Sequence, residues 1–338
     1  MDEPEKLSPP PAWLGVIEDI DTFGLKATVF KTAMELDVFT TIADGCQRLE
    51  EIARATACSV RGMRVLLDAL CPLGLLTNSA GSYALTPPAQ AFLVRTEPTC
   101  CMDIYLALFQ GRERFTDCVR TGKPALDLSG PEAEDLWASY TAQFLVRWPW
   151  FAEIVRRRWE TAGVAARAVS GAHILDVGSG AGVKSFVLAQ ADPTIRITAV
   201  DTPKVLAVAA RIAGAMGVAG QVSYQPGDVL HMDLGREQFD IVLFGNVLRF
   251  FAANHIQDIL REVHQALKSG GLVVIDDDVL NEERPQTEQV LLTAVFLVNS
   301  APYGDFHTLS QYRELLEGAG FTQVTLHGDR PLTARKGN

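Results

Sequence analysis

An acid followed at once by a glycine-rich turn is the part of this sequence best suited to chemistry. An apolar run ends in Asp176, and three glycines follow at alternate positions: Gly178, Gly180 and Gly182. The helix-compatible run 183–190 comes next, so the order is strand, tight turn and helix start. This order brings backbone N–H groups and a helix N-terminus up to a ligand. A second apolar run, 195–200, ends in Asp201, and a carboxylate there suits a ribose diol.

The glycine spacing separates two ligand classes. A dinucleotide fingerprint reads G-x-G-x-x-G, but here Val183 stands at its third glycine position and the glycine comes one residue early. An early G-x-G-x-G after an acid, with a second acid ending the next strand, resembles the S-adenosylmethionine site of class I methyltransferases. The alternative is a glycine-rich connection that binds nothing.

The elements that must position these residues form an α/β pattern over residues 171–338. Strands are predicted at 173–177, 196–200, 221–225, 239–244, 271–276, 321–327 and 332–335. Helices are predicted at 183–191, 203–216, 254–268 and 309–318. The run Ser269-Gly270-Gly271 is expected to end the helix 254–268 as a glycine C-cap. Right-handed connections would place helices on both faces of a doubly wound sheet.

In such a sheet, ligands bind at the carboxyl ends of the strands. The polar residues and glycines at these ends, beyond the first turn with its Ser179, are Asp201, Thr202, Gly227, Asp228, Val229, Gly245, Asn246, Arg249 and Asp276 to Asp278. So many carboxylates suit a cationic sulfonium ligand. Asp201 would hold the ribose hydroxyls, Asp228 would accept from the adenine amine, and Asp176 would shape the glycine turn. For Asp228 the alternative is a simple turn residue.

Composition excludes several other functions. The chain has 338 residues and a net charge of −11, which argues against a nucleic-acid or acidic-membrane partner. Its six cysteines show no zinc spacing and lie before residue 119, so free thiols are expected. No cluster of His, Asp or Glu has metal spacing. Residues 1–11 lack the features of a secretory signal, and the longest apolar run, 290–298, is too short for a membrane span. A cytoplasmic enzyme is expected.

Residues 12–98 are expected to form a winged-helix module. Helices are predicted at 25–36, 49–56 and 60–70, followed by a hairpin with strands 75–77 and 83–85 that Pro87 and Pro88 close. DNA binding is one use of such a module, but the second helix of the pair offers only Arg61 and Arg64. Subunit pairing is the other use, because the module is rich in apolar residues: Val29, Phe30, Met34, Leu36, Val38 and Phe39.

Residues 99–170 are expected to be helical and contain four of the five tryptophans. Most of the aromatic residues would form a helical core, and some could line an apolar substrate pocket. Four arginines in this part are expected on a solvated helix face: Arg156, Arg157, Arg158 and Arg167.

Over residues 15–335 the chain resembles the dimeric S-adenosylmethionine-dependent O-methyltransferases of small molecules, of caffeate and bacterial natural-product type. The runs that carry the resemblance are 31–39, 64–70, 73–76, 83–86, 176–182, 227–228, 246–248, 267–271 and 312–321. The resemblance implies a Rossmann-like domain with a seven-stranded sheet at 171–338, a winged-helix domain that dimerises, and methyl transfer to a hydroxyl.

One position departs from that family. Arg249 stands where the family has a histidine that deprotonates the acceptor, and arginine cannot act as a base near neutral pH. Asp277 matches a second catalytic carboxylate of the family, and His307 lies in the loop that carries a third acid there. Arg249 could stabilise an acceptor that is already anionic, or Asp277 or His307 could act as the base. The simplest alternatives are a salt bridge from Arg249 to one of Asp276 to Asp278 and a loop role for His307.

The sequence therefore predicts a homodimeric enzyme that uses S-adenosylmethionine, most simply to methylate an acidic hydroxyl of a hydrophobic, ring-containing secondary metabolite. The expected partners are a small-molecule substrate and a second copy of the chain. Three alternatives stay open: a C-methyltransferase, a cofactor-retaining hydroxylase or pericyclase, and a winged-helix transcription regulator.

Overall fold

The structure is a computed structural model that describes residues 15–280, 282 and 287–337. The chain divides into two compact units between Met102 and Asp103. Most of the helical part at 99–170 therefore belongs to the second unit, together with the large sheet.

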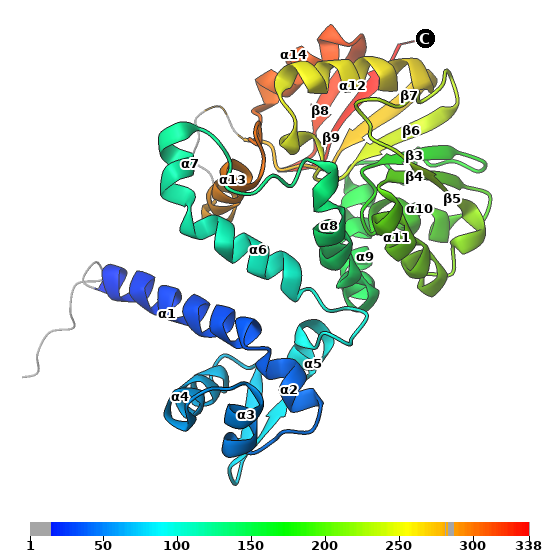
Figure 1. Ribbon diagram of the computed structural model, residues 1–338. Helices are drawn as coiled ribbons and strands as arrows, with labels where there is room; N and C mark the ends of the chain where they lie inside the picture. Colours follow the sequence, from blue (N-terminus) through cyan, green and yellow to red (C-terminus); the bar gives the residue numbers. More distant parts are fainter. Residues whose placement is uncertain (1–14, 281, 283–286, 338) are drawn as a thin grey trace, which may run out of the picture. The chain divides into compact units, whose positions relative to one another are not determined.

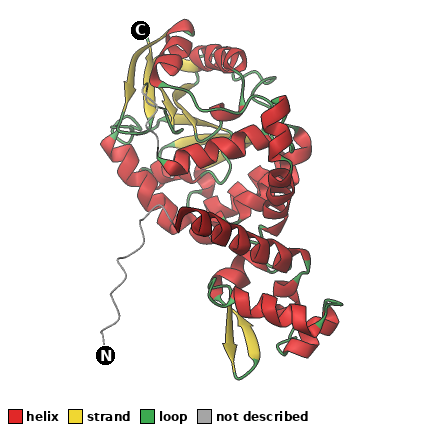
Figure 2. Cartoon of the chain, turned by 90° about the vertical axis from the view of Figure 1, so that its left-hand side faces the viewer, coloured by secondary structure: helices red, strands yellow, loops and turns green. Residues whose placement is uncertain are grey.

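The first unit contains helices and one hairpin, seen as the small pair of strands in Figure 2. Its elements are α1 (Val16–Glu35), α2 (Val38–Ala43), α3 (Leu49–Ala55), α4 (Val60–Leu70), β1 (Leu76–Ser79), β2 (Ser82–Leu85) and α5 (Pro87–Leu93). Helices α3 and α4 and the hairpin lie within two residues of the predicted winged-helix elements, which confirms that outline. Pro87 and Pro88 end the hairpin as expected and also begin α5, because the fixed φ of proline suits a first helical turn.

The exposed apolar residues of this unit lie earlier in α1 than the sequence analysis predicts. Met34, Val38 and Phe39 are buried, because the end of α1 packs against α2 and α4. The strongly exposed apolar side chains of α1 are Val16, Ile17, Ile20, Phe23 and Leu25. The first half of α1 therefore presents an exposed apolar surface.

The second unit begins with helices and continues into the sheet. Its helices are α6 (Met102–Glu113), α7 (Phe115–Thr121), the 3₁₀ turn η2 (Pro131–Ala133), α8 (Glu134–Ala142), α9 (Phe144–Thr161), α10 (Val183–Ala191), α11 (Pro203–Ala215), η3 (Ala219–Gln221), η4 (Leu248–Phe250), α12 (Ala253–Ala266), α13 (Glu288–Ser300) and α14 (Leu309–Gly318). Its strands are β3 (His173–Val177), β4 (Arg196–Asp201), β5 (Val222–Pro226), β6 (Phe239–Phe244), β7 (Leu267–Ile275), β8 (Phe321–Leu326) and β9 (Leu332–Lys336).

The seven strands run in the order β5-β4-β3-β6-β7-β9-β8. Strands β3 to β7 are parallel, and β9 is antiparallel to both β7 and β8. This confirms the predicted class and the seven-stranded sheet. The chain order reverses between β3 and β6, so the crevice for a ligand opens at the carboxyl ends of these two neighbours.

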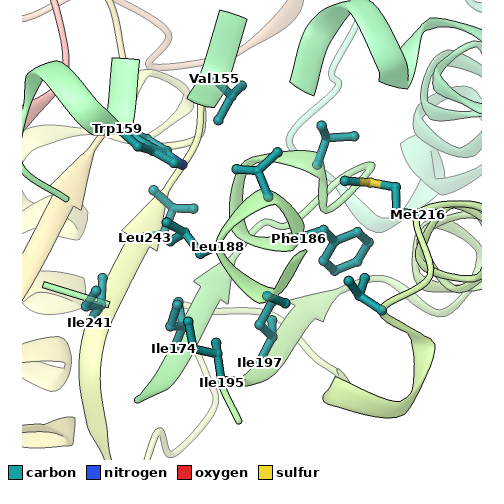
Figure 3. Close-up of a cluster of buried hydrophobic side chains, with 14 of the residues drawn as sticks. Val155, Trp159, Ile174, Phe186, Leu188, Ile195, Ile197, Met216, Ile241 and Leu243 are labelled. Carbon is teal, nitrogen blue, oxygen red and sulfur yellow. The ribbon is translucent and has the colours of Figure 1, made fainter. Parts of the chain in front are cut away.

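Alternate residues of the central strands face two separate hydrophobic cores. Ile174 and Leu243 point to the core covered by α9, α10 and α11, and Leu175 and Phe244 point to the core covered by α12 and α14. Figure 1 shows these two helical layers on the two sides of the sheet. Figure 3 shows the first core, with Phe186 and Leu188 of α10 among its labelled side chains. Burial on both faces explains why these strands read as continuous apolar runs.

Two predictions about the later elements are wrong or incomplete. The run 269–271 does not cap a helix, because α12 ends at Ala266 and β7 already begins at Leu267. Leu267 already pairs with Phe239 of β6, and residues 269–271 lie in the irregular stretch of β7 before pairing resumes at Leu272. The apolar run 290–298 forms most of helix α13, which was not predicted. None of the helices in the described ranges has the length and apolar character needed to cross a membrane.

Candidate active site

The turn between β3 and α10 requires its glycines. Gly178, Gly180 and Gly182 all have positive φ, between +52° and +70°. A Cβ on Gly178 would lie 2.5 Å from Cγ2 of Val247, and one on Gly182 would lie 2.1 Å from Cζ of Phe186. The turn therefore fits closely against neighbouring side chains as well as adopting a conformation that favours glycine.

Asp201, at the end of β4, holds this turn in place. Its Oδ2 accepts a hydrogen bond from the backbone N–H of Gly180 at 2.8 Å, and its Oδ1 accepts one from the N–H of Thr202 at 2.8 Å. Beside it, the hydroxyls of Ser179 and Thr202 are buried without a hydrogen-bond partner among the described residues. Two unpartnered hydroxyls next to a carboxylate suit a ribose diol, which both donates and accepts. These residues therefore fit the adenosyl group of S-adenosylmethionine.

Asp176 is buried at the end of β3, and its Oδ2 accepts a hydrogen bond from the Ser185 hydroxyl at 2.6 Å. Burial raises its pKa to about 7, although the hydrogen bond and the nearby Lys184 oppose the rise. Asp176 is thus bonded to the first turn of α10, just after the glycine loop.

The raised pKa of Asp176 predicts a pH effect on stability. Between its ordinary value of 3.8 and about 7 the unfolded chain has released the proton that the folded chain still holds. The free energy of unfolding should therefore fall as the pH rises through this window. The variant Asp176→Asn stays neutral, so wild type should lose stability relative to it between about pH 5 and 7 in urea unfolding. The exposed Asp258→Asn serves as the control; curves for Asp176→Asn parallel to wild type would contradict the assignment.

Asp228 follows β5 in an exposed turn. Its carboxylate accepts hydrogen bonds from the N–H of Leu230 at 2.9 Å and from Nδ1 of His231 at 3.0 Å. The preceding Gly227 donates its N–H to the carbonyl oxygen of Asp201 at 3.2 Å, so this turn lies beside the end of β4. The local hydrogen bonds of Asp228 are those of a turn residue. Its position beside the end of β4 is also compatible with the expectation that it binds adenine.

The three consecutive aspartates after β7 have different surroundings. Asp276 is fully buried. Its carboxylate accepts a hydrogen bond from Nη1 of Arg158 at 2.9 Å and pairs with Nζ of Lys184 at 2.7 Å. Burial alone would raise its pKa, but the charges of Lys184 and Arg158 outweigh burial and keep the pKa below its ordinary value. Arg158 therefore does not lie on a solvated face as predicted, whereas Arg156 and Arg157 pair with Glu153 at the surface.

Arg249 and Asp277 face each other in the buried part of the site. Nε of Arg249 lies 3.7 Å from Oδ1 of Asp277, and its Nη1 lies 3.9 Å from Oδ2 of Asp278, distances of ion pairs without hydrogen bonds. This Nε and both oxygens of Asp277 are buried and lack a hydrogen-bond partner among the described residues. Burial raises the pKa of Asp277, although the charge of Arg249 opposes it.

His307 joins this group through the loop 301–308. The N–H of Asp305 donates to the carbonyl oxygen of Arg249 at 3.0 Å, which ties the loop to η4. The His307 ring contacts Tyr312, whose pKa is raised by burial and, to a smaller extent, by the nearby charge of Asp277. Nε2 of His307 is buried without a described partner, and burial lowers the pKa of the ring. Of the predicted trio, Arg249 and Asp277 are therefore brought together, and the loop that carries His307 is bonded to the segment of Arg249.

Four cationic side chains lie among the three aspartates at this end of β7: Arg158, Lys184, Arg249 and Arg330. Lys184 also interacts with the buried carboxyl of Asp176, so these four cations stand against four carboxyl groups.

Lys184, Arg158 and Arg330 were not predicted as site residues from the sequence. Lys184 carried a signal, since it is the single charged residue in the apolar run Val183–Ala191. Arg158 carried none, because nothing in the sequence distinguishes it from the two arginines before it.

Comparison with known proteins decides the family. Residues 164–322 match the O-methyltransferase domain model, and residues 22–95 match the O-methyltransferase dimerisation domain model. The chain belongs to the O-methyltransferase family. This O-methyltransferase uses S-adenosylmethionine, and its dimerisation domain supports a homodimer.

Its relatives include enzymes of bacterial secondary metabolism. It is 26% identical to the tetracenomycin polyketide synthesis 8-O-methyl transferase TcmO of Streptomyces glaucescens, over 89% of each chain. It is also 26% identical to the 3-hydroxy-5-methyl-1-naphthoate 3-O-methyltransferase of Streptomyces sahachiroi, over 91% of this chain and 90% of that one. Among solved structures, a putative O-methyltransferase of Nostoc punctiforme matches with a TM-score of 0.70 and 26% identity, over 98% of this chain and 100% of that one.

Proposed function

We propose that this O-methyltransferase methylates an acidic hydroxyl of a hydrophobic, ring-containing secondary metabolite, and that Arg249 binds the hydroxyl as its anion. The observation that carries the proposal is the buried ion pair between Arg249 Nε and the Asp277 carboxylate. The two groups lie 3.7 Å apart, and neither Nε nor the carboxylate oxygens have a hydrogen-bond partner among the described residues. Buried polar atoms without partners are costly, so a ligand that supplies partners is favoured.

The side chains around Arg249 explain how such an acceptor would be prepared. Bound S-adenosylmethionine would supply an electrophilic methyl group. Arg249 cannot take a proton, but its charge lowers the pKa of a hydroxyl placed beside it. The rings of Phe250 and Phe306 lie 5.8 and 5.7 Å from its guanidinium carbon and exclude water, which strengthens the charge interaction. Asp277 and His307 are the groups that could instead accept a proton.

The cofactor would be held at the ends of β3 to β6. Asp201 with Ser179 and Thr202 would bind the ribose, and Asp228 would accept from the adenine amine. The remaining residues that we propose for this site are Asp176, Gly178, Gly180, Gly182, Gly227, Val229, Gly245 and Asn246.

We further propose that the N-terminal module, at 12–98, pairs subunits in the cytoplasm and binds no nucleic acid. Its candidate recognition helix α4 carries Arg61 and Arg64, and Arg64 is paired with Asp68 at 3.3 Å. The chain's net charge of −11 also opposes contact with phosphates.

A pair of acceptors with different hydroxyl acidities tests the proposal. With methyl-labelled S-adenosylmethionine, kcat/KM for 2-naphthol and for the more acidic 4-nitro-1-naphthol should each rise with pH up to the pKa of that acceptor's own hydroxyl. The acidic acceptor should therefore be methylated faster at neutral pH.

Two results would count against it. If the pH profiles of kcat/KM for the two acceptors had the same midpoint, a group of the protein, Asp277 or His307, would be acting as the base. No transfer to any phenol, enol or acid, alongside micromolar cofactor binding, would favour a non-methylating enzyme.

A further inference from the structure

Lys184 occupies an unusual place for a lysine. It lies in the first turn of α10, its side chain is 11% exposed, and the Cβ that Gly245 lacks would come within 2.9 Å of its Nζ. Burial lowers its pKa, while the charge of Asp276 opposes the effect. A side chain placed so tightly has one position available to its ammonium group.

The ammonium of Lys184 binds a main-chain group as well as a carboxylate. Its Nζ donates to the carbonyl oxygen of Asp276 at 3.2 Å, in addition to Asp276 Oδ2 at 2.7 Å. With its amide nitrogen turned toward the same carbonyl oxygen, Asn246 donates to that oxygen at 3.2 Å, and its side-chain oxygen then accepts from Lys184 Nζ at 3.2 Å. This carbonyl belongs to the peptide group that joins Asp276 to Asp277.

Asp277 depends on this peptide for its position. Its two carboxylate oxygens have no hydrogen-bond partner among the described residues, so no side-chain bond orients them. The Asp276 N–H is also fixed, because it donates to the carbonyl oxygen of Phe244 at 2.8 Å. The backbone held by Lys184 therefore determines where the Asp277 carboxylate lies opposite Arg249.

The same turn of α10 also contacts the cofactor side of the site. Ser185, the next residue, donates to Asp176 below the glycine turn. The carbonyl oxygen of Lys184 accepts the indole N–H of Trp159 at 2.7 Å, and the neighbouring Arg158 binds Asp276. Two adjacent residues of α9 and two of α10 thus connect the glycine turn to the end of β7.

We propose that Lys184 is a positioning residue for methyl transfer: its ammonium fixes the peptide between Asp276 and Asp277 and so places the Asp277 carboxylate relative to Arg249 and the glycine turn. This inference rests on the proposed function in taking Arg249 and Asp277 as the acceptor site. The competing role for Lys184 is to neutralise the buried charge of Asp276 and nothing more.

A single and a double variant separate the two roles. Lys184→Met removes the bond to the peptide and leaves Asp276 with one cation fewer, so both stability and kcat should fall. Lys184→Met with Asp276→Asn rebalances the charge, so the melting temperature should recover. Because the peptide has lost the Lys184 ammonium and keeps only the Asn246 amide as a donor, kcat should stay on the order of 10- to 100-fold below wild type, the loss expected from a small misplacement.

A spectroscopic readout makes the test independent of turnover. The phenolate of 4-nitro-1-naphthol absorbs visible light, so its pKa in the complex can be titrated in the presence of S-adenosylhomocysteine. This bound pKa should shift in the double variant, while cofactor affinity by calorimetry stays within about threefold of wild type. Lys268→Met is the matched control, since Lys268 pairs with Asp240 at 2.8 Å near the opposite end of β7, and it should leave the bound pKa and kcat unchanged.

The outcomes are distinct. Recovery of kcat and of the bound pKa together with the melting temperature in the double variant would overturn the proposal, because charge balance would then be the whole role of Lys184. A wild-type protein that methylates no acceptor and leaves the bound pKa unperturbed would instead refute the proposed function.

Discussion

Replacing Arg249 by glutamine should lower kcat/KM for an acidic acceptor by on the order of 100- to 1,000-fold at neutral pH. The variant leaves the carboxylate of Asp277, which is fully buried, without its nearest cation. Removing one partner of a buried ion pair costs about 3–5 kcal/mol, and a loss of that size in the transition state corresponds to this range or more. Steady-state kinetics with 4-nitro-1-naphthol would measure the loss.

Matched variants at the same position sharpen this prediction. Arg249→Lys keeps a positive charge but loses the planar guanidinium, so it should retain the preference for acidic acceptors at a reduced rate. Arg249→His introduces a possible base and should weaken binding of the anionic acceptor. The affinity for S-adenosylmethionine should stay within about twofold of wild type in all three, because Arg249 contacts none of the proposed ribose-binding residues in the described structure. Unchanged acceptor affinity in the glutamine variant would rule out the proposed role.

Replacing Gly182 by alanine should abolish most cofactor binding and destabilise the second unit. Gly182 has a φ of +70°, and its added Cβ would lie 2.1 Å from Cζ of Phe186. Because the Phe186 side chain is fully buried in the core of Figure 3, it cannot move aside without disturbing that core. The left-handed backbone costs about 1–2 kcal/mol and the overpacking about 1–3 kcal/mol. We expect a loss of about 3 kcal/mol in the free energy of unfolding and at least a tenfold weaker cofactor affinity.

Gly214→Ala provides the control for this prediction. Gly214 lies inside helix α11, and a Cβ there would have no neighbour within 4 Å. Alanine should therefore leave cofactor affinity unchanged and raise stability by up to about 1 kcal/mol. Isothermal titration and urea unfolding would compare the two variants. Wild-type affinity in Gly182→Ala would show that the turn does not need its left-handed conformation.

The sheet and the cofactor turn could be predicted from the sequence because their signals are local. Apolar runs of strand length, each ended by a glycine or an acid, gave the parallel strands within a few residues, and Asp176 and Asp201 mark two of their ends. The predicted cap at 269–271 failed because strand pairing across β6 and β7 overrides a local glycine signal.

For the proposed acceptor-binding part of the site, the sequence indicates which residues take part but not how they are arranged in space. Arg249, Asp277 and His307 lie on three segments. An ion pair joins Arg249 to Asp277, and a main-chain bond from Asp305 joins the loop of His307 to Arg249. No periodicity reports such a contact. Likewise, Arg158 and its two arginine neighbours look alike in sequence, and the packing of α9 decides which one meets Asp276.

The position of β9 has a consequence for how the protein is made. Strand β7 lies inside the sheet, yet one of its two neighbours, β9, follows all the other described strands in the chain. During synthesis, β7 leaves the ribosome before β9, so the backbone groups along one edge of β7 stay unpaired until residues 332–336 are made. An uncovered apolar strand edge is a template for association with other chains. The nascent enzyme therefore passes through an interval in which chaperones can bind it, and messages cut short before β9 should yield aggregates rather than a smaller working enzyme.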